Sequence, residues 1–218
     1  MLGRLSVVTP VYGNEATLEE LYRRLAAVLA GEWSLRFVVD ASPDASLAVA
    51  RRLAAADDRV SVTALEANVG QHAALLRGLA ADDADVYACL DADLQDPPEA
   101  VPLLVGRLGA GVVFAGRRGA YEGRSRLITG ALHRRLQARL TGVPVDAGAF
   151  LAMDRPARDA LLALHPPSIV AGVGAAGIRS TSIPVERATR PSGRSAWSAP
   201  ARLRQSARTL AWAYRAQR

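Results

Sequence analysis

Short apolar runs alternate with longer segments of helical periodicity along the first half of the chain. Five of these runs are bounded by turn residues and predict buried strands: residues 5–12, 35–40, 60–65, 86–91 and 111–116. The connections between them are short. This β-α-β-α alternation predicts an α/β fold with a doubly wound, mostly parallel central sheet flanked by helices.

The segments between these strands predict helices over residues 15–30, 42–56, 70–81 and from Pro97 through Leu108. In the second helix, Ser42 is the expected cap and Pro43 the first helical residue. Asp96 and Glu99, on either side of a proline pair, form the expected capping signature of the fourth helix.

The pattern changes after residue 116, where a basic, glycine-rich loop occupies residues 116–126. The rest of the chain predicts a helix over 127–140, a strand over 147–155, a helix over 156–164, a strand from 181 that runs into an arginine- and serine-rich loop, and a last helix over 199–218. Because no repeat or low-complexity linker interrupts the chain, we expect one domain over residues 1–218.

The last helix has two distinct faces by its spacing. Leu203, Ala207, Leu210 and Tyr214 share one face, and Arg204, Arg208, Trp212 and Arg215 share roughly the opposite one. A basic helix with a tryptophan suits a membrane interface, whereas an alanine-rich helix with an arginine face also suits simple packing on the domain. Both interpretations remain open from the sequence.

Composition and charge indicate a folded protein with anionic ligands. Half of the 218 residues are apolar and 22% are charged, which argues against a disordered chain. The net charge is +6, and all 27 basic residues are arginine, which a GC-rich coding genome explains equally well. Arginine suits phosphates and carboxylates, so the expected ligands are a nucleotide, a lipid phosphate or a membrane surface. We expect no nucleic-acid partner, because the arginines are not interleaved with stacking aromatics.

The chain shows no signal for secretion and no membrane span. Its first residues turn to proline and glycine before an apolar core region forms, and no run approaches the roughly 20 apolar residues of a span. Cys89 is the only cysteine, so an internal disulfide or thiolate metal cluster is excluded. We therefore expect a cytoplasmic protein, with peripheral contact on the inner face of the membrane as the alternative.

Polar residues gather where four consecutive strands end. These segments are Thr9 to Glu15, Asp40 to Asp44, Asn68 to Gln71 and Asp91 to Asp96. Ligands of parallel sheets bind beyond the carboxyl ends of the strands. The four segments therefore predict one site.

Asp91 and Asp93 follow an apolar run in the order D-x-D. Residues i and i+2 of a strand point to the same face, so the two carboxylates are expected on one side, where Mg²⁺ or Mn²⁺ would suit them. A D-x-D pair alone is common, and Asp96 suits a helix cap better than a metal ligand. Asp40, at a neighbouring strand end, is expected to accept hydrogen bonds from a base or ribose.

Read together, these segments resemble a known family. The stretches LSVVTPVYGNEATLEEL, FVVDASPDAS, ANVGQHAALLRGLAA, VYACLDADLQDPPE, DAGAFLAMDR and VERATRPSGRSAWS resemble, in order and spacing, a family-2 glycosyltransferase of GT-A fold. The branch they resemble is that of dolichyl-phosphate mannose synthase and the bacterial polyprenyl-phosphate sugar transferases. Each motif alone is loose, but six in register are specific.

The resemblance implies a Rossmann-like GT-A domain whose residues 1–116 bind the nucleotide sugar. The residues that match the nucleotide site are Pro10, Tyr12 and Glu15 along its wall, Asp40 at the base, Asn68, Gly70 and Gln71 in the loop over the nucleoside, and Asp91 and Asp93 at the ribose and metal, with Gln95 as a further metal ligand. The implied cofactor is Mg²⁺ or Mn²⁺.

Residues 117–198 are implied to bind the acceptor, ahead of the basic helix over 199–218. Arg187, Arg190 and Ser195 match an element near the diphosphate, and Arg117, Arg118, Arg124 and Arg126 fall where the family collects cations for the acceptor phosphate. Relatives often read G-D-F-R where this chain reads Gly148-Ala149-Phe150-Leu151. Asp146 is therefore the first candidate for a base, and an acceptor that is already an ionised phosphate needs positioning more than deprotonation.

The implied reaction is a single displacement with inversion at the anomeric carbon of an NDP-sugar, with Asp93 and Asp146 as the catalytic residues. The acceptor is expected to be a polyprenyl phosphate. Two alternatives stay open: the same chemistry on a soluble small-molecule acceptor, and an inactive nucleotide-sugar-binding domain, which Ala149 and Leu151 favour. The sequence does not specify the sugar, the nucleotide base or the oligomeric state.

The segment GVGAAG, residues 172–177, matches the G-x-G-x-x-G fingerprint of dinucleotide sites. It follows two prolines rather than a clear strand and lacks an acid about 20 residues further on. We therefore expect packing glycines within a helix.

Overall fold

The computed structural model describes residues 3–118, 135–136, 138–188 and 199–216, without the side chains of residues 117, 118 and 199–204. Its described strands form one sheet in the order β3-β2-β1-β4-β6-β5-β7. The strands are β1 (Leu5–Val11), β2 (Trp33–Asp40), β3 (Val60–Leu65), β4 (Val86–Cys89), β5 (Val112–Arg118), β6 (Leu151–Asp154) and β7 (Ser180–Glu186). Only β6 pairs antiparallel in this part of the chain, with β4 and with β5. The prediction of a mostly parallel sheet is confirmed.

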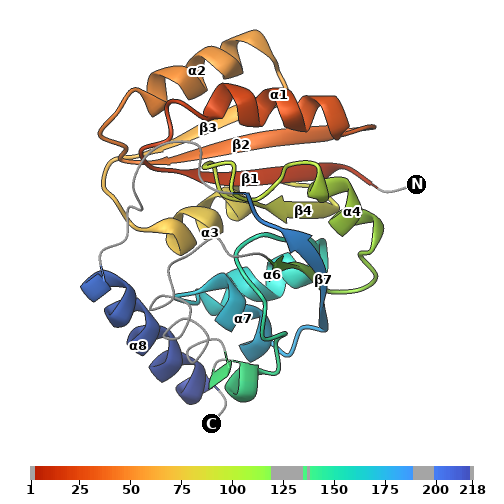
Figure 1. Ribbon diagram of the computed structural model, residues 1–218, viewed down its shortest axis with the longest axis vertical. Helices are drawn as coiled ribbons and strands as arrows, with labels where there is room; N and C mark the ends of the chain where they lie inside the picture. The colour runs from red at the N-terminus through yellow and green to blue at the C-terminus, as the bar shows by residue number, and fades with distance from the viewer. Residues whose placement is uncertain (1–2, 119–134, 137, 189–198, 217–218) are drawn as a thin grey trace.

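Helices cover both faces of the sheet (Figure 1). They are α1 (Leu18–Val28), α2 (Ser46–Ala56), α3 (Gln71–Ala81), α4 (Ala100–Gly106), α6 (Arg155–Leu164), α7 (Ile169–Ala175) and α8 (Ala199–Ala216). Successive strand residues face opposite sides, so Val7 packs in the core under α1, α2 and α4, and Val8 in the core with α3, α6 and α7. A strand buried on both faces reads as a continuous apolar run, which is why these strands were visible in the sequence.

Several predicted boundaries were wrong. The second helix begins at Ser46, so Ser42 and Pro43 lie in the turn before it. There the Ser42 hydroxyl donates to the Asp44 carboxylate at 2.6 Å instead of capping the helix. The fourth strand ends at Cys89, two residues earlier than expected. Strong side-chain hydrogen bonding in both turns competes with the regular backbone ladder and shortens the elements.

Within residues 205–216, the buried positions of the last helix lie on neither of the two faces that its spacing defined. Thr209 and Ala213 are the buried residues of this part, at 2% and 0% exposure, and Gln205 donates to the Pro167 carbonyl at 2.7 Å. Tyr214 stays 51% exposed. α8 contacts α7, and in the described part of α8 the buried face consists of small and polar side chains.

The glycines of the GVGAAG segment serve packing, as predicted. A Cβ on Gly172 would lie 2.5 Å from atoms of Leu161 and Pro166, and one on Gly174 would lie 2.4 Å from Thr141. Both glycines lie in α7, and the absence of a side chain lets α6 and the neighbouring loops pack against it.

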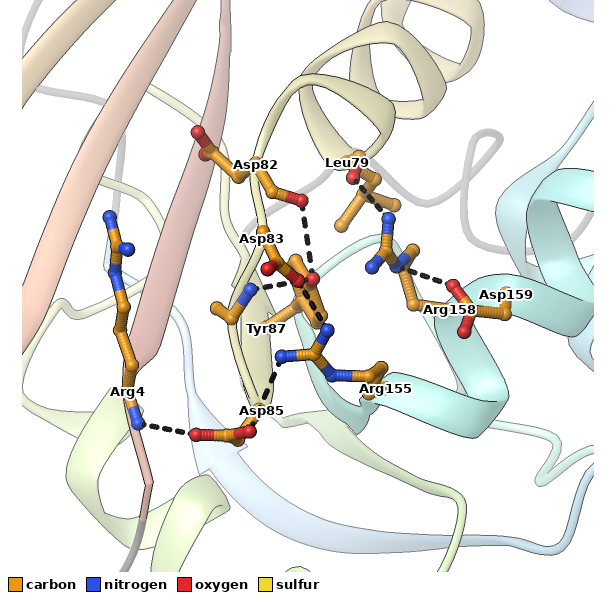
Figure 2. A network of polar contacts seen from close by, with 10 residues as sticks. Arg4, Leu79, Asp82, Asp83, Asp85, Tyr87, Arg155, Arg158 and Asp159 are labelled. Carbon is orange, nitrogen blue, oxygen red and sulfur yellow. Dashed lines mark hydrogen bonds and ion pairs between the residues drawn. The ribbon is translucent and has the colours of Figure 1, made fainter.

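A network of charged residues ties the structure together near the amino ends of β1 and β4 (Figure 2). Asp82 accepts hydrogen bonds from Ser6 Oγ at 2.7 Å and from Arg36 Nε at 2.8 Å. The Tyr87 hydroxyl donates to the Asp82 carbonyl at 3.2 Å, and the guanidinium of Arg158 lies 4.7 Å from the Tyr87 ring. In Figure 2, Arg155 forms ion pairs with Asp83 and Asp85 of the same loop. This network lies at the opposite edge from the strand ends with the predicted site.

Candidate functional site

The strand register brings both halves of the chain to one edge of the sheet. Strands β1 to β5 and β7 run in the same direction, so their carboxyl ends meet there. Leu151, the first residue of β6, pairs with Cys89 of β4 and with Phe114 of β5. Residues 146–150 therefore approach the same edge as Asp91.

The turns after β1 and β2 are joined by hydrogen bonds. The backbone N–H of Gly13 donates to Ser42 Oγ at 2.8 Å, and that of Asn14 donates to Ser46 Oγ at 3.0 Å. Thr17, before α1, donates to the Ala92 carbonyl at 2.6 Å and links the first turn to the D-x-D segment. The convergence of these strand ends was predicted correctly, whereas these hydroxyl contacts were missed.

Glu15 and Tyr12 have different surroundings in this turn. The Glu15 carboxylate accepts the backbone N–H of Ala45 at 2.7 Å, so it holds the start of α2. Tyr12 is 41% exposed, and Pro10 is half-buried in β1. Of the three residues assigned to the nucleotide wall, Tyr12 and Glu15 are exposed, and Tyr12 offers an aromatic surface to a ligand.

Asp44 is held as a carboxylate by the same turn. Burial raises the pKa of Asp44, but hydrogen bonds from Ser42 and Ser46 outweigh burial and lower it to about 2. A carboxyl whose pKa is lower in the folded state stabilises the fold above its unfolded pKa, here near 3.8, and this contribution is lost as the pH falls toward 2.

We therefore expect Asp44→Asn to lower the free energy of unfolding by about 1–2 kcal/mol at pH 7, and by progressively less between pH 4 and pH 2. Urea unfolding of both proteins across this pH range measures the difference. A difference that stays constant down to pH 2 would contradict the role of the Asp44 charge.

Asp40 organises the loop that follows β3. The residue is buried at 3% exposure, and its carboxylate accepts the backbone N–H groups of Val69 at 2.7 Å and Gly70 at 2.8 Å. The Asn68 amide donates back to the Asp40 carbonyl at 3.2 Å. Gly70 has a φ of +88°, which favours glycine. The predicted contact of Asp40 with a base stays a prediction, and its observed contacts position the loop.

Asp91 lies between an amide and a guanidinium. Gln71, at the start of α3, donates to Asp91 Oδ1, and Arg187 Nη2 lies 4.0 Å from Asp91 Oδ2. The Nε of Arg187 lies 2.6 Å from Asp96 Oδ1. Burial would lower the pKa of Arg187, but the charges of Asp96 and Asp91 outweigh it and raise that pKa. Arg187 is thus a buried cation that stays protonated among carboxylates.

The structure corrects two expectations about the D-x-D segment. It lies in a turn beyond β4 rather than on the strand, with Leu94 at a φ of +59°, so strand alternation does not orient its carboxylates. Asp93, 8% exposed, accepts the N–H of Gln95 at 3.0 Å. Asp96 does not cap the fourth helix, because that helix begins at Ala100 and Asp96 pairs with Arg187 instead.

The donor chemistry of this turn fits a hard dication. Asp91 and Asp93 offer carboxylate oxygens, and the Asp91 side chain is 24% exposed. Within the described part of the chain, no group of three or more His, Cys, Asp or Glu residues could hold an ion by itself. Mg²⁺ commonly takes one or two carboxylates and completes its shell with substrate phosphates, which is the arrangement that two aspartates suit. Gln95 is held by its backbone, whose carbonyl accepts the N–H of Ala188 at 2.9 Å.

Asp146 lies against the end of β5. A Cβ added to Gly116 would lie 2.3 Å from Asp146 Oδ2, so the carboxylate occupies the space that any other residue would fill. Ala149 and Leu151, which replace an aspartate and an arginine of the family pattern, are buried at 5% and 0% exposure. These two positions belong to the apolar core.

The predicted cationic cluster is only partly described. Arg117 and Arg118 are the last residues of β5 and pair with Val185 and Glu186 of β7. The structure describes only the backbone of these two arginines. Arg124, Arg126, Arg190 and Ser195 lie outside the described residues. Their roles at the acceptor and the diphosphate stay predictions.

Some contacts could have been read from the sequence, and others could not. Thr17 and Glu20 match the T-x-x-E capping box, which marked Thr17 as a helix start but gave no hint of its bond to Ala92. The pair of Arg187 and Asp96 carried no local signal.

Comparisons with known proteins agree with this geometry. A family model described as glycosyl transferase family 2 matches residues 6–162. Two relatives named undecaprenyl-phosphate 4-deoxy-4-formamido-L-arabinose transferase, from Salmonella paratyphi A and Salmonella dublin, are each 35% identical over 207 residues, covering 89% of this chain and 63% of the relative. The chain thus spans less than two thirds of the length of these relatives.

Solved structures share the fold. Glucosyl-3-phosphoglycerate synthase from Mycobacterium tuberculosis, in complex with Mn²⁺, UDP and phosphoglyceric acid, matches with a TM-score of 0.70 at 21% identity over 98% of this chain and 78% of that one. A mannosyltransferase from Pyrobaculum calidifontis, in complex with GDP-mannose and Mn²⁺, matches with a TM-score of 0.59 at 19% identity over 86% of this chain and 56% of that one. The predicted fold class is confirmed.

Proposed function

The chain belongs to glycosyl transferase family 2, and from this we propose that it is a metal-dependent inverting glycosyltransferase that moves a sugar from an NDP-sugar to a polyprenyl phosphate. The relatives at 35% identity carry names of undecaprenyl-phosphate sugar transferases, which supports this class of acceptor. The Mn²⁺ and UDP of the glucosyl-3-phosphoglycerate synthase structure support a metal and a nucleotide donor.

The observation that carries the proposal is the turn with Asp91 and Asp93 at the edge where the other strand ends meet. The loop held by Asp40 lies beside it, since Gln71 of that region donates to Asp91. A nucleoside bound at this edge would lie against Tyr12 and the loop, with its diphosphate toward the two aspartates. A bound Mg²⁺ or Mn²⁺ would neutralise charge on the departing diphosphate.

Arg187 supplies a fixed positive charge to the same turn. Its side chain is 6% exposed, so solvent screens its charge weakly. By pairing with Asp96 and lying near Asp91, it limits repulsion between the carboxylates and holds the turn in one conformation. Preorganised charges of this kind usually make the largest contribution to the rate. Direct contact of Arg187 with the diphosphate stays part of the proposal.

The acceptor oxygen would attack the anomeric carbon from the side opposite the diphosphate. We assign its phosphate to the arginines of residues 117–126 and assign the role of base to Asp146. An ionised phosphate makes Asp146 dispensable as a base, whereas an acceptor hydroxyl would depend on it. No helix within the described residues is long and apolar enough to cross a membrane. Because a polyprenyl phosphate resides in the bilayer, the proposal includes peripheral contact with the inner face of the membrane, made by α8.

The contact between Gly116 and Asp146 gives a prediction that separates the two kinds of acceptor. Gly116→Ala forces the Asp146 carboxylate out of its place, and Asp146→Asn removes its charge in place. If the acceptor is a hydroxyl, both variants should lower kcat by about 10²-fold or more, as loss of a general base does. If it is a phosphate, Asp146→Asn should keep kcat within about threefold of wild type. Steady-state kinetics on each acceptor, with Asp58→Asn as the control, measures this.

The proposed function is tested by a transfer screen. NDP-sugars are incubated with Mn²⁺ or Mg²⁺, with and without a short polyprenyl phosphate, and release of the nucleoside diphosphate and the glycosylated lipid are measured. Release that requires the lipid supports the proposal and names the donor. Metal-dependent binding of a nucleotide sugar without turnover on the lipid would overturn it and leave a soluble acceptor or an inactive binding domain.

A further inference from the structure

A cavity lies beside the candidate site, between α3, α8 and the loop before α7. Its volume is about 720 Å³, within the usual range of small-ligand pockets. In Figure 1, α8 lies below α3 and beside α7 at the end of the molecule farthest from α2. The residues that line the cavity include none of Asp40, Asp91, Asp93 or Arg187. It therefore adjoins the candidate site, with which it shares Gly70 and Gln71.

The charged side chains described in the lining of this cavity are positive. Three guanidinium groups line it, those of Arg77 from α3 and of Arg208 and Arg215 from α8. His72 and His165 also belong to its wall, and no carboxylate is among the described residues that line it. No ion pair joins these three arginines to an acid among the described residues, in contrast to Arg36, Arg155 and Arg187. Three guanidinium groups around one hollow suit an anion, above all a phosphate.

The remaining wall of the cavity is apolar. Trp212 of α8 is half-buried, and Leu76, Pro166 and Pro167 line the hollow with it. A simple inorganic anion would leave this apolar surface in contact with water. A ligand with an anionic head and an apolar chain would cover both parts of the wall, because apolar burial stabilises it by about 25 cal/mol per Å².

The inner wall of the cavity is shared with the candidate donor site. Val69, Gly70 and Gln71 line the cavity, and the same residues donate hydrogen bonds to Asp40 and Asp91. On the far side, His72 Nδ1 accepts the N–H of Ile169 at 3.4 Å and ties this wall to α7. A ligand in the cavity would thus lie directly behind the loop of the donor site.

We propose that the cavity between α3 and α8 is a binding site for a phosphate-bearing amphiphile, with the phosphate held by Arg77, Arg208 and Arg215 and the apolar chain against Trp212 and Leu76. None of these side chains is assigned to the acceptor phosphate in the proposed function. It does not depend on transfer activity, so binding alone tests it.

The test uses the fluorescence of Trp212 in the full chain, without donor or metal. Farnesyl phosphate is titrated against wild type, against the double variant Arg208→Gln, Arg215→Gln, and against Arg51→Gln. Arg51 is an exposed arginine of α2, far from the cavity. The substitution Arg51→Gln therefore serves as the control, because it removes a positive charge of the same kind at a distant position. Trp212→Phe identifies the part of the signal that comes from the cavity, and circular dichroism confirms that each variant is folded.

We expect farnesyl phosphate to change the Trp212 signal and the double variant to weaken binding at least about tenfold, since hydrogen bonds to charged groups are strong. Arg51→Gln should bind as wild type does. Equal binding in the double variant would overturn the proposal, as would a farnesol affinity equal to that of farnesyl phosphate. Inorganic phosphate that binds as tightly as farnesyl phosphate would overturn the role of the apolar wall.

A second arm identifies the source of the phosphate. Vesicles of phosphatidylglycerol carry a phosphodiester headgroup, whereas farnesyl phosphate carries a monoester. Sedimentation with these vesicles that is lost in the double variant would assign the cavity to a membrane phospholipid. Binding of farnesyl phosphate without vesicle sedimentation would assign it to a polyprenyl phosphate. Neither result depends on turnover, so failure of the transfer screen and failure of this proposal are distinguishable.

Discussion

Replacing Asp93 by alanine is expected to lower the rate of sugar transfer by about 10³-fold, the scale of losing one preorganised electrostatic contact to the departing group. Asp93 is buried in the turn beyond β4, where its charge is poorly screened. The same change removes the hydrogen bond from the Gln95 N–H, so part of the effect would come from a loosened turn.

Asp93→Asn separates these two contributions. Asparagine keeps an oxygen that can accept the Gln95 N–H but lacks the charge, so an equally large loss in this variant assigns the effect to the carboxylate. Calorimetric titration of Mn²⁺ with a nucleoside diphosphate provides a readout besides turnover, and both variants should weaken it. Asp58→Ala, at an exposed position after α2, removes the same charge and should leave rate and binding at wild-type values. Full activity of Asp93→Asn would contradict the role of Asp93 as a metal ligand.

The second large effect is expected on stability and lies at the opposite edge of the sheet. Asp82→Ala should lower the free energy of unfolding by about 3–5 kcal/mol, because it leaves a part-buried guanidinium without its partner. The side chains of Arg36 and Asp82 are only 17% and 12% exposed, and Asp82 also accepts the hydroxyl of Ser6. These contacts join β1, β2 and the end of α3, so their loss affects three elements at once.

Asp83 provides the matched control for Asp82. It is the next residue, and it also pairs with an arginine, Arg155, but its side chain is 79% exposed (Figure 2). Because exposed ion pairs contribute about 0–1 kcal/mol, Asp83→Ala should change stability by less than about 1 kcal/mol. Urea unfolding measures both, and nucleotide binding below the unfolding transition should stay unchanged in both. Equal losses in the two variants would contradict the importance of burial.

The candidate site shows where sequence reasoning succeeds. Asp40, Asp91 and Asp93 were located because parallel strands end at one edge, and each polar residue follows an apolar run. The same reasoning failed for Asp96, which was expected to cap a helix and instead pairs with Arg187. A capping signature is a local pattern, and the competing partner lies in a different part of the chain.

The last helix shows a similar limit. Its spacing defined a leucine face and an arginine face, but within residues 205–216 α8 is buried through Thr209 and Ala213. Amphipathicity ranks faces by hydrophobicity, whereas the contact with α7 depends on how closely two backbones can approach. The cavity between α3 and α8 follows from that packing: the sequence grouped Arg208, Trp212 and Arg215 on one face, but not their position opposite Arg77 of α3.

By itself, then, the sequence determined the α/β fold, the edge that holds the site and the family, because these depend on hydrophobic periodicity and on motifs within a few residues of one another. Only the tertiary structure decided the partner of each polar side chain. The Glu15 carboxylate accepts a hydrogen bond from the N–H of Ala45, 30 residues away, and the Thr17 hydroxyl donates one to the Ala92 carbonyl, 75 residues away. Hydrogen bonds act over about 3 Å in space, regardless of distance along the chain, so partners from separate elements are defined only once the sheet order is known.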